Sequence, residues 1–321
     1  MLAEKIKLTF AALFLFLLNL LMFGCSTSQL TKYELGLESY NNGRYRTAVD
    51  YFTRAIWEDP TNSELYFWRG NAKAKLKLND EAILNYTTAI KLDPEMKYYK
   101  NRGLMFIETK NYRNAISDFN EALIFDSTNS TLYFNRGYTQ ALSSNYESAI
   151  KDYSKAIFLD STNAKVFVNR GDLWSGVEEH QKAIFDFTSA ILVNDKDELA
   201  YFNRAKEFAI IGMFEQAIDD YSKAIILNPS NIEYYFLRGE LKVGAAEFLS
   251  AAADYTKIIS LQPDNGNAYY NRGICYANIN LKDNACDDLN RAGELGFFEA
   301  YEVIRKFCMK EEKKKKKKKK K

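Results

Sequence analysis

One marker residue returns along most of this chain at a nearly fixed spacing, and it constrains the fold more than any other feature. The marker is a glycine, replaced once by alanine, and the sequence numbers of successive markers differ by 34, or in one case by 33. The eight markers are Gly36, Gly70, Gly103, Gly137, Gly171, Ala205, Gly239 and Gly273. A period of this length predicts repeated supersecondary structures, each burying its apolar face against its neighbours.

Each repeat carries the same apolar pattern after its marker. An alanine comes first, then an aromatic residue or leucine four positions later, and then an alanine or isoleucine after a further three; in repeat one these are Ala48, Phe52 and Ala55. Offsets of four and three place these side chains on one stripe of a helix, where small residues beside a ring let a second helix approach closely. All four prolines fall at one register near the end of the repeat. The pattern predicts two antiparallel helices and a turn in every repeat.

This pattern resembles the tetratricopeptide repeat (TPR), in which a small residue, alanine, an aromatic residue, alanine and proline follow one another at the same period. The resemblance covers residues 29–299, with repeats at 29–62, 63–95, 96–129, 130–163, 164–197, 198–231, 232–265 and 266–299. It implies an all-α protein, a right-handed α-solenoid of eight helix-turn-helix repeats. Residues 300–309 continue with apolar side chains, and we expect them to form the capping helix that closes such a stack.

Two positions of the repeat change together from copy to copy. In repeats two to eight an arginine precedes the marker, and an aspartate, or asparagine in repeat two, directly precedes the aromatic residue or leucine; repeat one has Leu35 and Tyr51 instead. We predict half-buried ion pairs that contribute more to packing specificity than to net stability. The pairs are Arg102 with Asp118, Arg136 with Asp152, Arg170 with Asp186, Arg204 with Asp220, Arg238 with Asp254 and Arg272 with Asp288. An arginine ladder that binds phosphates is the alternative.

Residues 1–24 have the pattern of a secretory signal peptide. Lys5 and Lys7 precede an apolar stretch over residues 8–23, which is short for a transmembrane helix. Gly24 and Cys25, followed by a polar linker over residues 25–28, resemble the lipobox of bacterial lipoproteins. The resemblance implies that Cys25 carries acyl chains and anchors the protein at the bacterial cell envelope, with Ser26 favouring the outer over the inner membrane. An uncleaved anchor and an ordinary signal peptide are the alternatives.

Residues suited to catalysis are scarce. His180 is the only histidine, and it falls at a turn register that holds aromatic residues in most other repeats. This argues against a catalytic triad and against a zinc site with two histidines. The glycines stand singly, which argues against a phosphate-binding loop. We therefore predict a non-catalytic protein with no cofactor and no metal site.

The cysteines beyond Cys25 suggest one covalent link. Cys286 occupies a core register of repeat eight, and Cys308 lies on the expected capping helix. A disulfide between them would suit an oxidising compartment, whereas two buried free thiols are equally consistent with their positions.

The resemblance to TPR proteins also implies a binding surface, because fixed positions of each first helix line the concave groove in that family. One such position is apolar or aromatic in seven of the eight repeats, and a second includes Tyr138. The first position holds Tyr33, Phe67, Lys100, Phe134, Val168, Phe202, Phe236 and Tyr270. Rings exposed in a groove bind partner helices or extended peptides, whereas rings packed against neighbouring repeats would serve the fold alone, and both interpretations are open.

Charge separates the chain into two regions. Lys313 to Lys321 contribute +9 and residues 1–24 contribute +1 to a net charge of +2, which leaves −8 for the rest. An acidic body argues against specific nucleic-acid binding. The tail over residues 310–321 is expected to be disordered, and either to contact polyanions or to have no function.

We expect an interaction scaffold that binds protein or peptide partners and is held at the membrane by its lipid anchor. A second hypothesis is an accessory subunit that recruits glycan or peptidoglycan substrates to an envelope enzyme. An RNA-binding solenoid is a third.

Overall fold

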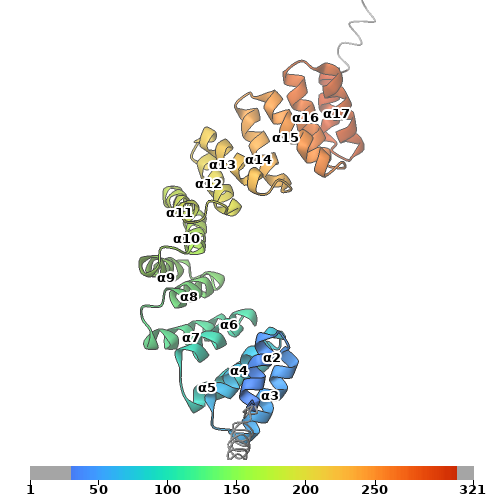
Figure 1. The fold of residues 1–321 in the computed structure, drawn as a ribbon. Coiled ribbons are helices and arrows are strands. Elements are labelled where there is room, and N and C mark those ends of the chain that lie inside the picture. Colours follow the sequence, from blue (N-terminus) through green and yellow to red (C-terminus); the bar gives the residue numbers. More distant parts are fainter. Residues whose placement is uncertain (1–29, 309–321) are drawn as a thin grey trace, which may run out of the picture. The chain divides into compact units, whose positions relative to one another are not determined.

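The computed structural model describes residues 30–308, and all its regular elements are helices (Figure 1). The expected all-α fold class, with two helices in every repeat, is confirmed. The signal peptide, Cys25 and the lysines from 313 to 321 lie outside the described residues. Within residues 30–308, each helix is too short or too polar to cross a membrane.

The repeats fall into two compact bodies, one ending at Phe125 and the other beginning at Asp126. The N-terminal body contains repeats one to three: α2 (Lys32–Asn41), α3 (Tyr45–Glu58), α4 (Ser63–Lys75), α5 (Asn79–Leu92), α6 (Met96–Glu108) and α7 (Tyr112–Phe125).

The C-terminal body contains repeats four to eight and the cap. Its helices are α8 (Ser130–Leu142), α9 (Tyr146–Leu159), α10 (Ala164–Gly176), α11 (His180–Val193), α12 (Glu198–Ile210), α13 (Phe214–Leu227), α14 (Ile232–Gly244), α15 (Phe248–Leu261), α16 (Gly266–Asn278), α17 (Lys282–Glu294) and α18 (Glu299–Val303), followed by a π-helical turn, Ile304–Cys308.

The first helix of most repeats begins at a side chain that caps its free backbone N–H groups. Asn62, Asn129, Asn163 and Asn231 accept hydrogen bonds from backbone N–H groups of the first turn, and Asp197 does so in repeat six. Each asparagine cap follows a turn that ends the preceding second helix, so the local sequence separates one repeat from the next.

The turn between the two helices of each repeat contains a residue with left-handed backbone, seven positions after the marker. Only Gly43 and Gly212 are glycines at this register; the other six are Lys77, Lys110, Ser144, Glu178, Ala246 and Asn280, with φ between 59° and 63°. Side chains with a Cβ atom are strained in this conformation. The uniform turn is therefore imposed by the packing of the two helices on each other.

In repeats one to seven the core is a ring of the second helix pressed against the marker of the first, and Leu289 takes the place of the ring in repeat eight. Phe52, Tyr86, Phe119 and Phe187 are at most 1% exposed. A Cβ atom placed on Gly70 would lie 2.8 Å from the ring of Tyr86. The glycine thus permits an approach that a larger residue would obstruct.

In repeats three to eight, the arginine before the marker forms two hydrogen bonds with the aspartate of its own repeat, whereas Arg69 of repeat two donates one to Asn85. Arg102 donates from Nε to Asp118 Oδ2 at 2.8 Å and from Nη2 to Oδ1 at 2.7 Å. Nη1 of the same side chain donates to the Thr87 hydroxyl of the preceding repeat at 3.0 Å. The same contact to a preceding hydroxyl is made by Arg69 with Thr53, Arg170 with Ser154, Arg204 with Thr188, Arg238 with Ser222 and Arg272 with Thr256.

In all six predicted arginine–aspartate pairs, an arginine nitrogen lies within 2.7 Å of an aspartate oxygen. The arginine side chains are 16–20% exposed and the aspartates at most 9%. A guanidinium engaged in this way is poorly placed to bind a phosphate. The geometry therefore favours the structural role over the phosphate ladder.

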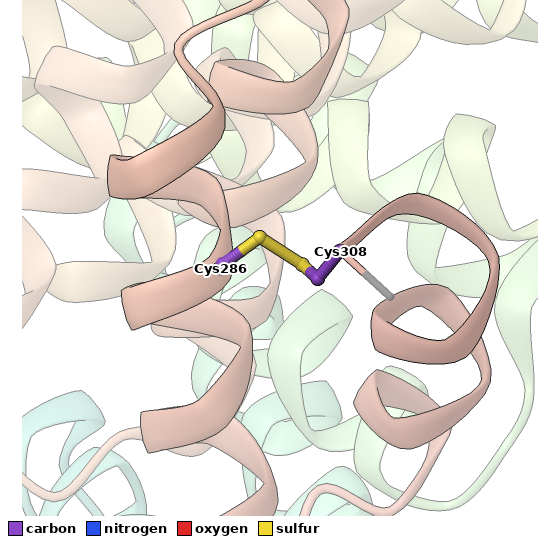
Figure 2. The surroundings of a disulfide bond; sticks show 2 residues. All are labelled: Cys286 and Cys308. Atoms are coloured by element: carbon purple, nitrogen blue, oxygen red, sulfur yellow. A yellow bond between two sulfur atoms is a disulfide. The ribbon is translucent and has the colours of Figure 1, made fainter. Parts of the chain in front are cut away.

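A disulfide joins the capping segment to the last repeat (Figure 2). Cys286 on α17 and Cys308 in the π-helical turn are bonded, with their Cα atoms 6.0 Å apart. Cys275 is buried and free. The link holds the capping segment, whose Ala300 and Ile304 are buried, against α17.

Candidate functional site

Two of the rings expected to line the groove are buried. Phe67 lies between Tyr86 and Tyr98, with ring centroids 6.0 and 5.1 Å away, and it is 8% exposed. Phe202 lies between Tyr221 and Tyr234 in the same way and is also 8% exposed. These two rings pack the first helices together and offer little surface to a ligand.

The other members of the row are half-buried. Each ring contacts another ring of its own body: Tyr33 with Phe52, Phe134 with Tyr153, Phe236 with Tyr255 and Tyr270 with Phe297. Lys100 and Val168 are half-buried as well. Tyr138 is 41% exposed and stacks on Phe134 at 6.5 Å, so it is the predicted site residue most accessible to a partner in the C-terminal body.

The N-terminal body holds a concave pocket of about 520 Å³, which we call the Trp68 pocket. The first helices α2, α4 and α6 supply most of its lining. The lining residues are Tyr40, Trp68, Asn71, Ala74, Lys75, Lys77, Tyr86, Asn101, Leu104 and Met105. The first row of predicted binding residues is not among them, but Asn71 and Leu104 hold the register of Tyr138, the second position expected to line the groove.

The pocket has an aromatic wall and an amide floor. Tyr40 meets Trp68 edge to face, with ring centroids 5.4 Å apart. Asn71 Oδ1 accepts two hydrogen bonds of 2.8 Å, from the Tyr86 hydroxyl and from Asn101 Nδ2. Burial raises the pKa of Tyr86, which keeps its hydroxyl protonated as a donor. The floor is therefore fixed before any ligand arrives.

The sequence carries one signal for this pocket. Position 68, two residues before the marker, holds tryptophan, whereas asparagine occupies the same register in five other repeats, Asn101 among them. A single tryptophan in a row of asparagines places one large ring next to the amides. This contrast between repeats could have indicated the pocket.

A polar cluster lies between repeats five and six of the C-terminal body. Glu207 is 2% exposed; it accepts a hydrogen bond from the Ser175 hydroxyl at 2.6 Å, and its Oε2 lies 2.7 Å from His180 Nδ1. The serine is bonded to the carboxylate rather than to the imidazole, so the three residues do not form a nucleophile with its base. His180 was expected only as a packing ring of the turn, and its partner Glu207 was not foreseen.

Asp172 lies beside this cluster. Its Oδ1 accepts a hydrogen bond from Asn203 Nδ2 at 2.8 Å. The residue retains access to solvent, but the surrounding helices desolvate its carboxyl and raise the pKa of Asp172 to about 6, with Lys206 acting in the opposite direction and Glu207 in the same direction. Among residues 30–308, groups of three or more histidine, cysteine or acidic side chains that could hold a metal ion do not occur.

Family models described as tetratricopeptide repeat match residues 33–95, 130–163, 199–231 and 236–295, more than half of the chain. DnaJ homolog subfamily C member 7 of Homo sapiens is 35% identical over 95 residues, which cover 28% of this chain and 19% of that protein. Hsp70-Hsp90 organizing protein 2 of Arabidopsis thaliana is 29% identical over 100 residues, which cover 31% of this chain and 18% of that protein. The chain thus spans about a fifth of the length of these relatives.

Solved structures with the same fold cover far more of the chain. The C-terminal part of a TPR repeat-containing protein from Cytophaga hutchinsonii has a TM-score of 0.67 at 20% identity and covers 74% of this chain and 98% of its own. A tetratricopeptide repeat protein from Parabacteroides merdae has a TM-score of 0.55 at 20% identity, and the match covers 76% of this chain and 97% of that one. The family models and the shared fold agree with the geometry of the repeats, and the chain is a tetratricopeptide repeat protein.

Proposed function

We propose that this protein is a non-catalytic interaction scaffold that binds an extended peptide segment of a partner protein in the Trp68 pocket. The observation that carries the proposal is the pocket itself, which combines an aromatic wall with a preformed amide floor. Its volume of about 520 Å³ falls in the usual range for ligand pockets. The Arabidopsis relative, named for organizing Hsp70 and Hsp90, is consistent with a role in holding proteins.

Each part of the lining suits a peptide. The rings of Tyr40 and Trp68, with Leu104 and Met105, would bury one apolar side chain. The amides of Asn71 and Asn101 can exchange hydrogen bonds with a peptide backbone. Lys75 and Lys77 are exposed at this pocket, and they would favour an acidic residue next to the apolar one.

A library of linear peptides displayed on phage and selected against the full chain tests this function. Peptides with an aromatic or aliphatic residue beside an acidic one should be enriched, and Trp68→Ala should weaken their binding at least about tenfold, the usual loss at a central aromatic contact. Tyr138→Ala, in the C-terminal body, is the matched control and should bind as the wild type does. Binding that depends on Tyr138 and not on Trp68 would place the peptide elsewhere and refute the proposal.

We further infer that the scaffold works at the bacterial cell envelope, anchored through Cys25. The apolar stretch followed by Gly24 and Cys25 supports this, and so does the bond between Cys286 and Cys308, since disulfides persist in oxidising compartments. Metabolic labelling with a clickable palmitate analogue should label the wild type and not Cys25→Ala. Absence of label from both proteins would refute the anchor and leave the peptide site untouched.

A further inference from the structure

Strongly exposed apolar side chains recur at one position of the second helices, two positions after the alanine or isoleucine that ends the apolar pattern of the repeat. In the C-terminal body they are Phe158 on α9, Leu192 on α11 and Ile226 on α13, which are 79%, 82% and 73% exposed. We call these three residues the outer apolar row. Trp57 and Ile124 occupy the same register in the N-terminal body and are equally exposed. Single exposed apolar residues are common, but the return of such residues at one register in three consecutive repeats places them in one row along the second helices.

Basic side chains accompany this row. Lys155 and Lys223 lie three residues before Phe158 and Ile226, on the same face of their helices, and Lys257 holds the equivalent position on α15. Lys155 Nζ lies 5.1 Å from the centroid of the Phe158 ring. These lysines belong to the sequence between the two termini, whose net charge is −8, and the exposed Asp219 lies seven residues before Ile226 on the same helix face.

The surface continues along α11 toward its N-terminus. Phe185, 66% exposed, lies seven residues before Leu192 and therefore on the same helix face. It borders a shallow pocket together with Trp174 and Lys182, and Lys182 Nζ lies 4.5 Å from the Trp174 ring centroid. Aromatic rings paired with lysines are characteristic of protein surfaces at the membrane–water interface.

We propose that the outer apolar row and its lysines form a face that docks onto a bilayer containing anionic lipids. The apolar side chains would enter the acyl boundary while the lysines contact lipid phosphates. A second copy of the chain fits less well, because two such faces would bring their lysines together.

The position of the expected lipid anchor supports a bilayer as the partner of this face. This step rests on the proposed attachment to the envelope. Cys25 precedes Leu30, the first described residue, by five positions. Five residues span at most about 18 Å when fully extended. An acylated Cys25 would therefore keep the first repeat close to a membrane, and the chain would tether the C-terminal body to that same membrane, where even weak docking of one face is effective.

The test uses the full chain with Cys25→Ser, so that docking is measured without acyl chains. A fluorophore sensitive to polarity (NBD) is attached through Leu192→Cys, with Lys206→Cys on α12 as the matched exposed control. Vesicles of phosphatidylethanolamine and phosphatidylglycerol are then added. We expect a blue shift and quenching by doxyl-labelled lipid at position 192 only. Because the signal is local, vesicle binding through the apolar N-terminus or the lysine tail cannot produce it.

A triple variant, Phe158→Ser, Leu192→Ser and Ile226→Ser, gives a second measurement. All three side chains are largely exposed, so the fold should survive, while the partition coefficient onto these vesicles should fall about tenfold or more relative to Cys25→Ser alone. An unchanged emission at position 192 on bound vesicles would overturn the proposal. A shift that appears with protein concentration and without lipid would also overturn it, in favour of self-association. Neither result bears on palmitate labelling of Cys25, so the face and the anchor are tested separately.

Discussion

Arg170 holds Asp186 with two parallel hydrogen bonds, from Nε to Oδ2 at 2.8 Å and from Nη2 to Oδ1 at 2.7 Å, and Nη1 reaches the Ser154 hydroxyl at 2.9 Å. One side chain thus joins the two helices of repeat five to the second helix of repeat four. Asp186 is 1% exposed, so its charge depends on this arginine for compensation.

Removal of the arginine alone should therefore be costly. We expect Arg170→Leu to lower the free energy of unfolding by about 3 kcal/mol, because it leaves the Asp186 carboxylate buried without its partner. Repeat one has leucine and tyrosine at these two registers, so the double variant Arg170→Leu with Asp186→Tyr should recover most of the loss. Urea unfolding of the three proteins measures both effects. A double variant as unstable as the single one would argue against the pairing as the source of the loss.

The strained turns give a prediction of the opposite sign. Ala246 has φ of 59°, and Ala246→Gly should raise the free energy of unfolding by about 0.5 to 1 kcal/mol, since relief of the backbone strain outweighs the greater entropy of glycine in the unfolded chain. Gly212 occupies the same register with φ of 81°, and Gly212→Ala should lower it by a similar amount. Thermal unfolding should show that the melting temperatures of the two variants shift in opposite directions from that of the wild type. Shifts of the same sign would contradict the strain argument.

The disulfide should stabilise the last repeat. Cys286 and Cys308 enclose a segment with a sequence separation of 22 residues, for which the loop-entropy model gives about 3 kcal/mol. We expect reductant to lower the urea midpoint of the wild type and to speed amide exchange in α17. The variant Cys286→Ala with Cys308→Ala should already show the lower midpoint and should not respond to reductant. A response of that variant would assign the effect to another group.

Asp172 should make stability depend on pH. Its folded pKa of about 6 exceeds the ordinary value of 3.8, so the folded state binds this proton more tightly than the unfolded state does. The charged carboxylate lowers the free energy of unfolding. This loss is absent at pH values below 3.8, grows as the pH rises, and is complete above 6. Asp172→Asn should therefore match the wild type near pH 4 and exceed its melting temperature at pH 7. Parallel pH profiles of the two proteins would contradict the raised pKa.

The sequence was sufficient to predict the register of both helices, because one marker position, glycine or alanine, and one core position, aromatic or leucine, return in all eight repeats. The arginine–aspartate register followed from their joint replacement in repeat one. The hydroxyls that complete the contact were not predicted, although Ser or Thr stands at their register in six of the repeats, because such residues on an amphipathic helix have no distinctive signature.

Exposure within the aromatic row depends on the residue that the next repeat places beside each ring. The sequence left open whether the rings pack against neighbouring repeats or line the groove, and the outcome differs from repeat to repeat. Phe67 and Phe202 are buried because Tyr98 and Tyr234 of the following repeats cover them. Phe134 packs instead against the smaller Val166 and stays half-buried. A position can thus be core in one repeat and surface in another with no change in its own identity.

Each arginine that bonds a hydroxyl reaches back to the repeat before it, and the acceptor there is always a serine or threonine at one register. Loss or duplication of one whole repeat within the C-terminal body would therefore rejoin an arginine to an acceptor of the same kind. At these two registers the array can lengthen or shorten in whole steps during evolution with no compensating substitution, whereas junctions with contacts of their own, such as Glu207 with Ser175, would lose them.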